Sequence, residues 1–192
     1  MPGIRSASRA PSVFIPGRLV NLRTLRETDA ASLFNYLQDE KVTKYLRAIP
    51  NPYTLKDARD FIKTSHLLLQ KQIEFDFGIE YCNAANIQLV GIVALAKATE
   101  GGHGAAEVGY WVGASYWNRG IASESLALVV DYAFSALRLH SVHAYVMKEN
   151  LASIRVLEKC GFSLEKELPS NTRKDGRWVD EVRYVRRLQA GL

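Results

Sequence analysis

Ten residues in the middle of the chain combine the side chains and the backbone freedom that a phosphate site needs. Residues 116–125 read YWNRGIASES and follow a β-rich run at 107–112. This order predicts a strand, a short loop and a helix start. The first amides of a helix have no partner within it and the helix dipole adds partial positive charge, so the junction can bind an anion. Gly120 allows close approach, and Asn118 and Arg119 add donors.

The same segment has a second interpretation. Arg119 and Gly120 also suit an ordinary loop before an amphipathic helix, whose first turn would hold Ala122, Ser123 and Glu124. A pair of small residues is a weak phosphate motif by itself. The surrounding sequence therefore has to decide between an anion site and a plain loop.

Three segments resemble the GCN5-related N-acetyltransferase (GNAT) superfamily. Residues 117–122, WNRGIA, are similar to its pyrophosphate loop, Gln/Arg-x-x-Gly-x-Gly/Ala, although the first position departs from that pattern. Residues 148–162, KENLASIRVLEKCGF, resemble a helix that carries Asn-x-x-Ser and ends in Gly-Phe. Residues 18–30 resemble the first strand and helix of the branch that includes the ribosomal-protein acetyltransferases RimJ and RimL. The resemblance covers residues 18–188.

The resemblance implies an acetyl-CoA-dependent N-acetyltransferase that moves the acetyl group directly to a primary amine in a ternary complex. The RimJ/RimL-like branch implies a protein N-terminal α-amine, with a ribosomal protein as partner. A small amine, such as an antibiotic, a polyamine or an amino acid, is the main alternative. A non-catalytic acyl-CoA-binding module is a third, against which the retained Glu107 and Ser153 argue. We expect a cytoplasmic protein, monomeric or homodimeric.

The resemblance also implies where the cofactor binds. Its pyrophosphate would lie on the loop and helix start formed by Trp117, Asn118, Arg119, Gly120, Ile121 and Ala122. Pantetheine would pair with the backbone of Tyr110, Trp111 and Val112 as though it were an added strand. Asn150 would hold the amide end of the cofactor. The alternative for Tyr110 and Trp111 is a hydrophobic sheet face, which alternation predicts for at least one of them.

Acyl transfer to an amine needs a base, a donor to the developing oxyanion and an acid. Glu107 matches the family's general-base position; an exposed acid or an ion-pair partner is the alternative. Many members use a tyrosine as the acid, but that position is Leu157, so Ser153 is the expected substitute. Ser153 and Asn150 also suit a helix cap. The amide of Val112 is the candidate oxyanion donor.

The acceptor is expected opposite the cofactor, in a region that the sequence describes less well. Tyr45, Tyr53 and Trp178 are candidate walls, although aromatic residues are more often core. RimL-like enzymes can carry a glutamate before the final hairpin turn, where this chain has Thr172. That departure separates the chain from RimL itself.

Composition indicates one globular domain. The chain has 192 residues, of which 47% are hydrophobic and 23% charged, and no apolar run is long enough to cross a bilayer. Residues 1–16 lack the apolar segment of a signal peptide and are predicted to be a flexible arm, so the GNAT-like domain spans 17–190. The net charge of +5 is spread along the chain without a nucleic-acid-binding motif, and a polyanionic cofactor explains part of it.

Neither a metal site nor a disulfide is expected. Cys82 and Cys160 lie far apart and have no Cys-x-x-Cys spacing. The four histidines have no spacing that would complete a zinc site with them. Because transfer is direct, neither cysteine is expected to act as a nucleophile.

Periodicity supplies the elements that position these residues. Strands are predicted at residues 19–24, 75–82, 88–97, 106–113, 142–147, 162–168 and 178–188, and helices at 28–39, 55–71, 121–137 and 152–160. The unit at 106–147 requires a right-handed crossover between parallel strands, with the ligand at their carboxyl ends. The fold class is therefore α/β (α+β) with a mixed, mostly antiparallel sheet. The resemblance implies about six to seven strands, splayed central parallel strands and about four helices.

Overall fold

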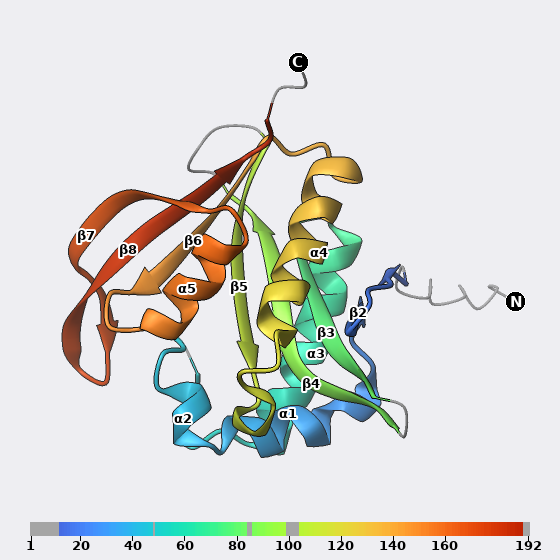
Figure 1. The fold of residues 1–192 in the computed structure, drawn as a ribbon. Helices are drawn as coiled ribbons and strands as arrows, with labels where there is room; N and C mark the ends of the chain where they lie inside the picture. Colours follow the sequence, from blue (N-terminus) through green and yellow to red (C-terminus); the bar gives the residue numbers. More distant parts are fainter. Residues whose placement is uncertain (1–11, 48, 84–85, 99–103, 190–192) are drawn as a thin grey trace, which may run out of the picture.

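A mixed sheet with helices on both of its faces forms the domain (Figure 1). The computed structural model describes residues 12–47, 49–83, 86–98 and 104–189. Within them the strands lie in the order β1-β2-β3-β4-β5-β6-β8-β7, and only β5 and β6 are parallel neighbours. The strands are β1 (Phe14–Ile15), β2 (Val20–Thr24), β3 (Glu74–Asn83), β4 (Asn86–Lys97), β5 (Ala105–Val112), β6 (Ser141–Met147), β7 (Ser163–Lys174) and β8 (Arg177–Arg187).

Helices begin where the sequence offers caps. The α-helices of the described residues are α1 (Ala30–Leu37), α2 (Glu40–Thr43), α3 (Leu55–Gln70), α4 (Ile121–Ser135) and α5 (Leu151–Lys159). The capping box predicted for α3 is confirmed: Asp57 donates its amide to Oγ1 of Thr54 at 3.2 Å, and Thr54 donates its amide to Asp57 at 2.8 Å. The end of α5 is also as expected, because Gly161 follows with φ of +78°.

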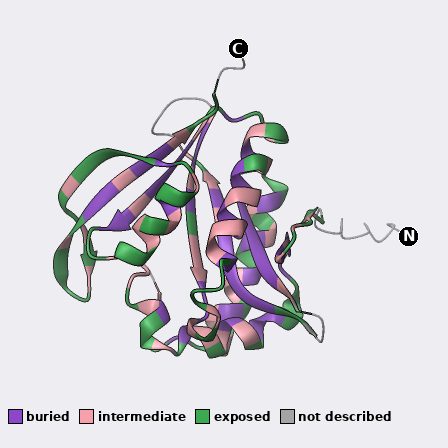
Figure 2. Cartoon of the chain, viewed as in Figure 1, coloured by how far each residue is buried: buried purple, intermediate pink, exposed green. Residues whose placement is uncertain are grey.

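Alternation along the strands divides the sheet into two faces, which we name after the helices that cover them. The α4–α5 face is apolar and includes the buried Phe77, Val108 and Val142. The α1–α3 face packs a smaller core around α1 and α3, with Ile92 from the sheet. Figure 2 shows the buried residues concentrated along the strands between these layers, whereas most of β7 is exposed. The two faces therefore differ in polarity, which matters for the site below.

The structure has more elements than the sequence indicated. The additional strand is β1, in which Phe14 pairs with Arg23 of β2. The prediction of a flexible arm over residues 1–16 is therefore wrong for its last residues, because backbone pairing to β2 holds them; residues 1–11 lie outside the described part. The additional helix is α2, which Asp39 caps by accepting the amide of Lys41 at 2.9 Å. β7 extends to Lys174, beyond its predicted end, through irregular pairing with β8.

Two of the predicted loops cannot be compared. The turn between β3 and β4 includes residues 84–85, and the glycine-rich loop before β5 includes 99–103; both lie outside the described residues. Among the residues that are described, no helix is long and apolar enough to cross a membrane.

Candidate active site

The centre of the sheet opens where β5 and β6 part. Pairing between them is limited to Ala105 with Ser141, Ala106 with Val142 and Glu107 with His143. On its other edge β5 stays paired with β4 as far as Val112. We call the space between Val108–Val112 of β5 and the later residues of β6 the V-shaped opening. Its two arms start together and diverge toward their carboxyl ends (Figure 1). The predicted splay of the parallel strands is therefore confirmed.

Glu107 and Tyr110 stand on opposite faces at this opening. They are three residues apart on one strand, so alternation directs their side chains to different sides of the sheet. Glu107 lies on the α1–α3 face, in register with Ala96 of β4. Tyr110 lies on the α4–α5 face and contacts α5. A base and an acid placed in this way can serve one reaction that runs through the opening.

Glu107 is the last β5 residue paired with β6, and it lies between charged neighbours. Its side chain is 40% exposed, and its Oε1 accepts from the Arg47 guanidinium at 3.3 Å. Burial raises the pKa of Glu107, with smaller contributions from Glu181 and Glu74, while Arg47 lowers it. A carboxyl with a raised pKa is a better proton acceptor near neutral pH than an ordinary one.

Arg47 connects Glu107 to a second, buried carboxylate. The segment between α2 and α3 carries Arg47, whose Nε donates to Oε1 of Glu181 on β8 at 2.8 Å. The side chain of Glu181 is 1% exposed, and its Oε2 accepts from the amide of Asn171 at 2.7 Å. The guanidinium also lies over the ring of Tyr145, 5.0 Å from its centroid. This Arg47 cluster joins three distant parts of the chain at the α1–α3 face.

Further acidic groups lie on the same face beside an open stretch of sheet. Glu74 of β3 is aligned with Glu107 through Ala96 of β4. Asp76 follows two residues later and is buried; this burial, together with Glu74, raises its pKa to about 7. In the same row Gly109 is exposed, and a Cβ built there would meet no atom within 4 Å. The α1–α3 face thus offers room next to several carboxyl groups, which suits a cationic acceptor.

Tyr110 meets Ser153 across the other side of the opening. Its hydroxyl lies 2.9 Å from Oγ of Ser153 and 3.2 Å from the Ser153 carbonyl oxygen, to which it donates. Burial raises the pKa of Tyr110, so the phenol stays protonated. Asn150 caps α5 by accepting the amide of Ser153 at 3.2 Å, so the capping interpretation of Asn150 holds. Leu157, at the position for which the family resemblance implied a tyrosine acid, is fully buried, whereas the hydroxyl of Tyr110 comes from β5.

Hydrogen bonding to β4 fixes which backbone groups of β5 face the opening. The amide of Gly113 donates to the Val90 carbonyl at 2.8 Å, so Gly113 and, by alternation, Trp111 direct their backbone groups to β4. Tyr110 and Val112 direct theirs to the open edge. The prediction that Trp111 pairs with pantetheine through its backbone is therefore wrong, since β4 occupies that edge. Its ring instead packs against Tyr36, with centroids 6.2 Å apart.

One group on the open edge already has a partner. Trp117 donates its indole Nε1–H to the Val112 carbonyl at 2.6 Å, which ties the loop before α4 to the end of β5. The Val112 amide remains on the open side, as its candidate role as oxyanion donor requires. Tyr110 and Val112 thus leave an edge to which the amides of an extended ligand can pair.

The start of α4 has the conformation that the anion-site prediction requires. Gly120 is the N-cap with φ of +80°, and no side chain caps the helix there. Asn118 also has a positive φ, +60°. A Cβ at Gly120 would meet only Leu19, at 3.7 Å, so the approach to the first amides of α4, from Ile121 onward, is open. These features fit the pyrophosphate of coenzyme A.

Glu124 has a structural role that the sequence did not reveal. Its Oε1 accepts the backbone amides of Arg18 and Leu19, both at 2.6 Å, and thereby fastens the segment before β2 to α4. No side chain makes a cap hydrogen bond at the start of α4. Glu124 therefore does not supply the first-turn cap that was one reading of the sequence.

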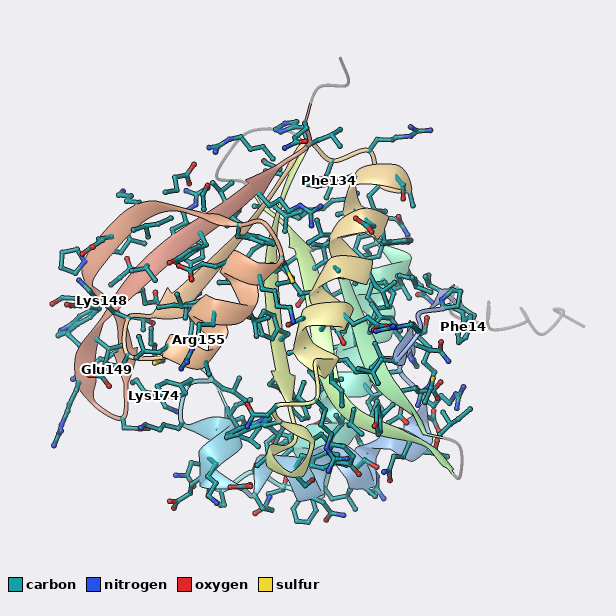
Figure 3. All side chains as sticks on the ribbon, in the orientation of Figure 1. Phe14, Phe134, Lys148, Glu149, Arg155 and Lys174 are labelled. Atoms are coloured by element: carbon teal, nitrogen blue, oxygen red, sulfur yellow. The ribbon has the colours of Figure 1, made fainter. Side chains whose placement is uncertain are left out.

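A basic groove continues from the loop along the outside of α4. Its volume is about 1200 Å³, and it extends from Arg119 and Gly120 to Phe134 and Arg138. Phe134 marks its far end on α4 (Figure 3). The remaining cations in its lining are Arg18, Lys159, Arg186 and Arg187. Neither Glu107 nor Tyr110 lines the groove, so its cations suit outer, phosphate-bearing parts of a ligand and not the reacting atoms.

The three predicted acceptor walls differ in their surroundings. Tyr45 is half-buried near the Arg47 cluster in sequence, with the Lys44 ammonium 4.9 Å from its ring centroid. Tyr53 is only 8% exposed and belongs to the core under α1 and α3, so its assignment as a wall is wrong. Trp178 is 64% exposed near the hairpin tip, and alternation places it on the opposite face to Glu181. It is therefore not a wall of the acceptor side.

Both cysteines contact backbone carbonyl groups. Cys160 donates to the Ser123 carbonyl at 3.3 Å, and burial raises the pKa of its thiol. Cys82 contacts the Glu80 carbonyl at 3.8 Å. A raised pKa disfavours the thiolate that a nucleophile needs.

Over the described ranges, no group of three or more His, Cys, Asp or Glu residues is arranged to hold a metal ion.

Comparison with known proteins identifies the family. A family model described as "Acetyltransferase (GNAT) domain" matches residues 19–163. The chain belongs to the GNAT family. The probable N-acetyltransferase YjcK of Bacillus subtilis is 36% identical over 171 residues, which cover 86% of this chain and 92% of YjcK. The spermidine N(1)-acetyltransferase of Escherichia coli is 28% identical over 167 residues, covering 85% and 83%.

Solved structures agree with this assignment. RimJ of Mycobacterium smegmatis, in complex with a CoA-disulfide, superimposes with a TM-score of 0.80 at 25% identity, over 92% of this chain and 86% of RimJ. The GNAT chain is accordingly an N-acetyltransferase whose acetyl donor is acetyl-CoA, as the sequence predicted. The catalytic and binding roles of its individual residues stay predictions, which rest on the geometry described above.

The sequence did not identify three side chains of this GNAT site. The hydroxyl of Tyr110 was overlooked because the residue was assigned for its backbone, although alternation from Glu107 would have placed its ring on the cofactor side. Arg47 and Glu181 left no local signal, because they lie 60 and 74 positions from Glu107 in opposite directions along the chain. Only the fold brings Arg47 and Glu181 to Glu107.

Proposed function

We propose that this N-acetyltransferase acetylates a protein N-terminal α-amine, which enters from the α1–α3 face while coenzyme A lies on the α4–α5 side of the opening. The observation that carries the proposal is the placement of Glu107 and the Tyr110–Ser153 pair on opposite faces of β5. Glu107 is 40% exposed, so a chain end can reach it from solvent. The similarity to the [Ribosomal protein uS5]-alanine N-acetyltransferase of Escherichia coli, 25% identical over 95 residues that cover 50% of this chain, supports a ribosomal protein as the partner.

Each group of the site has a defined task in this proposal. When bound, acetyl-CoA supplies an activated acetyl group as a thioester. Glu107 takes a proton from the acceptor's ammonium, directly or through water, and so produces the neutral amine. The Val112 amide is directed to the open edge, where it can donate to the developing oxyanion. The phenol of Tyr110 and the hydroxyl of Ser153 share a hydrogen bond and can deliver a proton to the sulfur side.

Holding both reactants accounts for much of the expected rate. Orientation of two bound reactants can contribute about 7 to 11 kcal/mol to the lowering of a barrier, whereas one proton-transfer group contributes about 100- to 10,000-fold in rate. The loop at Gly120 and the open edge of β5 would position the donor, and the α1–α3 face the amine. The side chains of Glu107, Tyr110 and Ser153 then refine a reaction that depends first on placement.

A polyamine is the second candidate acceptor, because carboxyl groups gather on the acceptor face. Glu74, Asp76, Glu107 and Glu181 all lie there, and Gly109 leaves open space beside them. Asp76 and Glu181 are buried, so a molecule with several ammonium groups would place one at Glu107 and another near Glu74. The 28% identity to the spermidine N(1)-acetyltransferase of E. coli supports this candidate.

The two candidates separate in a thiol-release assay with acetyl-CoA. The panel contains N-terminal peptides of ribosomal proteins, spermidine, free amino acids and aminoglycosides, and mass spectrometry locates the acetyl group. We expect kcat/KM for a peptide α-amine to exceed that for spermidine by about tenfold or more, which corresponds to about 1.4 kcal/mol of transition-state preference. A preference for spermidine would replace the first candidate by the second, and no release with any amine would overturn both.

A further inference from the structure

Arg47 holds its two carboxylates very differently. Its contact with Glu181 is short, 2.8 Å, and involves a carboxylate that is 1% exposed and also bound by Asn171. Its contact with Glu107 is longer, 3.3 Å, and involves a carboxylate that is 40% exposed. The Arg47 side chain itself is 38% exposed, but taking the cation from a buried carboxylate is costly, whereas an ion pair between two partly exposed side chains contributes little. The guanidinium is therefore firmly anchored at Glu181 and weakly attached at Glu107.

Tyr145 strengthens the inner anchor. Its ring centroid lies 5.0 Å from the Arg47 guanidinium and 5.6 Å from that of Arg183, so one aromatic ring contacts two cations. These contacts do not depend on Glu107. If the outer contact is broken, Glu181, Asn171 and Tyr145 still keep Arg47 within the cluster.

The outer contact lies where the acceptor must bind. Glu107 can take a proton from an ammonium group only if that group reaches its carboxylate, and the exposed Oε1 now carries the Arg47 guanidinium. The guanidinium is itself a cation with N–H donors and satisfies the carboxylate as an ammonium would. In the free protein, a side chain of the enzyme thus mimics the charged end of the substrate.

We propose that Arg47 is a specificity-determining positioning residue: the acceptor's ammonium displaces its guanidinium from Glu107, while Glu181 and Tyr145 retain it beside the site. The proposal rests on the role of Glu107 in the proposed function. Displacement favours a positively charged newcomer, because a neutral group would leave Glu107 with only the smaller electrostatic contribution of Arg183. The device therefore selects cationic primary amines and rejects alcohols and other neutral nucleophiles.

Displacement also couples substrate binding to proton transfer. With Arg47 attached, Glu107 is held toward its ionised form, ready to receive a cation. Once the guanidinium has moved away, the ammonium that replaces it is the cation beside the carboxylate, and an ammonium can give up a proton whereas the guanidinium of Arg47 cannot. The proton passes from the ammonium nitrogen to a Glu107 oxygen, which leaves the amine lone pair free to attack.

The test compares Arg47→Gln with Arg47→Lys in the full-length protein. We expect Arg47→Gln to lower KM for the amine up to about fivefold at a pH at which Glu107 is ionised, because no internal cation competes. KM for acetyl-CoA should stay unchanged, and the acidic limb of kcat/KM should move to higher pH. Arg47→Lys keeps a cation and should leave the limb near its original position. An unmoved limb together with an unchanged or increased amine KM in Arg47→Gln overturns the proposal.

The buried Glu181 requires a matched control. Arg47→Gln leaves this carboxylate without its cation, which can destabilise the fold whether or not Arg47 is displaced during binding. The double variant Arg47→Gln/Glu181→Gln removes the stranded charge as well, and thermal denaturation reports whether each variant is folded. The double variant should show the same lowering of amine KM as Arg47→Gln. If the effect disappears in the double variant, it came from Glu181 and the proposal fails.

A binding measurement keeps this test separate from activity. The probe is ethylammonium, with ethanol as its neutral counterpart, added to protein labelled for NMR detection of the Glu107 carboxyl carbon and the Arg47 Nε–H group. Ethylammonium should shift both signals and ethanol neither. If no amine is acetylated but these shifts occur, the displacement of Arg47 is supported and the proposed function fails. If acetylation occurs without any shift at Arg47, the proposed displacement of Arg47 is overturned while the proposed function stands.

Discussion

The hydroxyl of Tyr110 lies 2.9 Å from Oγ of Ser153, and this contact ties β5 to the first turn of α5 on the cofactor side of the V-shaped opening. The two residues are 43 positions apart in the chain, so no local sequence pattern predicts their contact. Leu157, at the position where the family resemblance implied a tyrosine acid, is buried and has no hydroxyl, so we propose that this pair supplies the acid. Its function can be tested by removing single oxygen atoms.

Tyr110→Phe removes the phenol and keeps the ring. Because the phenol is protonated and bonded to Ser153, its loss should lower kcat by about 10- to 100-fold, toward the lower end of the usual effect of an acid catalyst, with little change in either KM. Steady-state kinetics measure the change. Tyr184→Phe is the matched control, since Tyr184 donates to Glu158 at 3.0 Å, away from the opening. Equal losses in both variants would assign Tyr110 a structural role.

Ser153→Ala separates the two hydroxyls. If the serine delivers the proton and Tyr110 only orients it, Ser153→Ala should lower kcat at least as much as Tyr110→Phe. The cap of α5 should survive, because Asn150 accepts the backbone amide of residue 153 and not its side chain. Circular dichroism checks that α5 and the fold persist. Full turnover in Ser153→Ala would leave the Tyr110 hydroxyl as the acid.

Glu107→Gln should impair the enzyme in a pH-dependent way. At neutral pH the amine is mostly protonated, so loss of the base should lower kcat/KM by about 100- to 10,000-fold. Raising the pH deprotonates the free amine and should recover part of that loss. In the wild type, the raised pKa of Glu107 means that activity increases as pH rises through it, because only the ionised carboxylate accepts a proton.

A control carboxylate distinguishes base catalysis from general charge effects. Glu167→Gln removes an exposed acid that pairs with Lys148 at 2.7 Å outside the opening, and should leave the pH profile unchanged. Equal turnover of Glu107→Gln and wild type at every pH would show that Glu107 is an ion-pair partner for Arg47 only. That was the alternative interpretation of this residue from the sequence.

Much of the architecture follows from local sequence, whereas the acceptor side does not. The Thr54–Asp57 capping box, the apolar face of α4 and the Gly161 helix end are short-range signals, and each was predictable. The contacts of Arg47 with Glu107 and Glu181 span 60 and 134 residues and depend on how β8 and the segment after α2 meet. Tyr53 was assigned to a wall because an aromatic residue gives no local sign of whether it faces a core or a cleft.

Asp76 should make stability depend on pH in an unusual direction. Burial and the neighbouring Glu74 raise its pKa from 3.8 to about 7, so the folded protein binds a proton that the unfolded chain releases. Its contribution to stability is therefore present below pH 3.8 and is lost as pH rises through about 7. Asp76→Asn removes the titration. Its unfolding free energy should exceed that of the wild type by about 1 to 2 kcal/mol at pH 8, and by less at pH 5.

Denaturant unfolding at the two pH values measures this difference. Asp60→Asn is a suitable control, because Asp60 pairs with Lys56 on the exposed side of α3 and should not stabilise the protein at pH 8. If Asp76→Asn is less stable than the wild type at pH 8, the carboxylate makes favourable contacts in its ionised form and the raised pKa is wrong.

Gly120 and Gly176 form a matched pair for testing the phosphate loop. Both have φ of +80°, so a side chain costs similar backbone strain at either position, about 1 kcal/mol or more. Gly120 opens onto the start of α4, whereas Gly176 lies at the β7–β8 turn with no atom within 4 Å of an added Cβ. Gly120→Glu would place a carboxylate where the helix start is expected to bind pyrophosphate, so KM for acetyl-CoA should increase more than tenfold while amine KM changes little. Gly176→Glu should destabilise the fold to a similar degree yet leave KM for acetyl-CoA unchanged. Calorimetry with coenzyme A measures binding without turnover. Equal affinities of the two variants for coenzyme A would exclude the loop at Gly120 from the cofactor site.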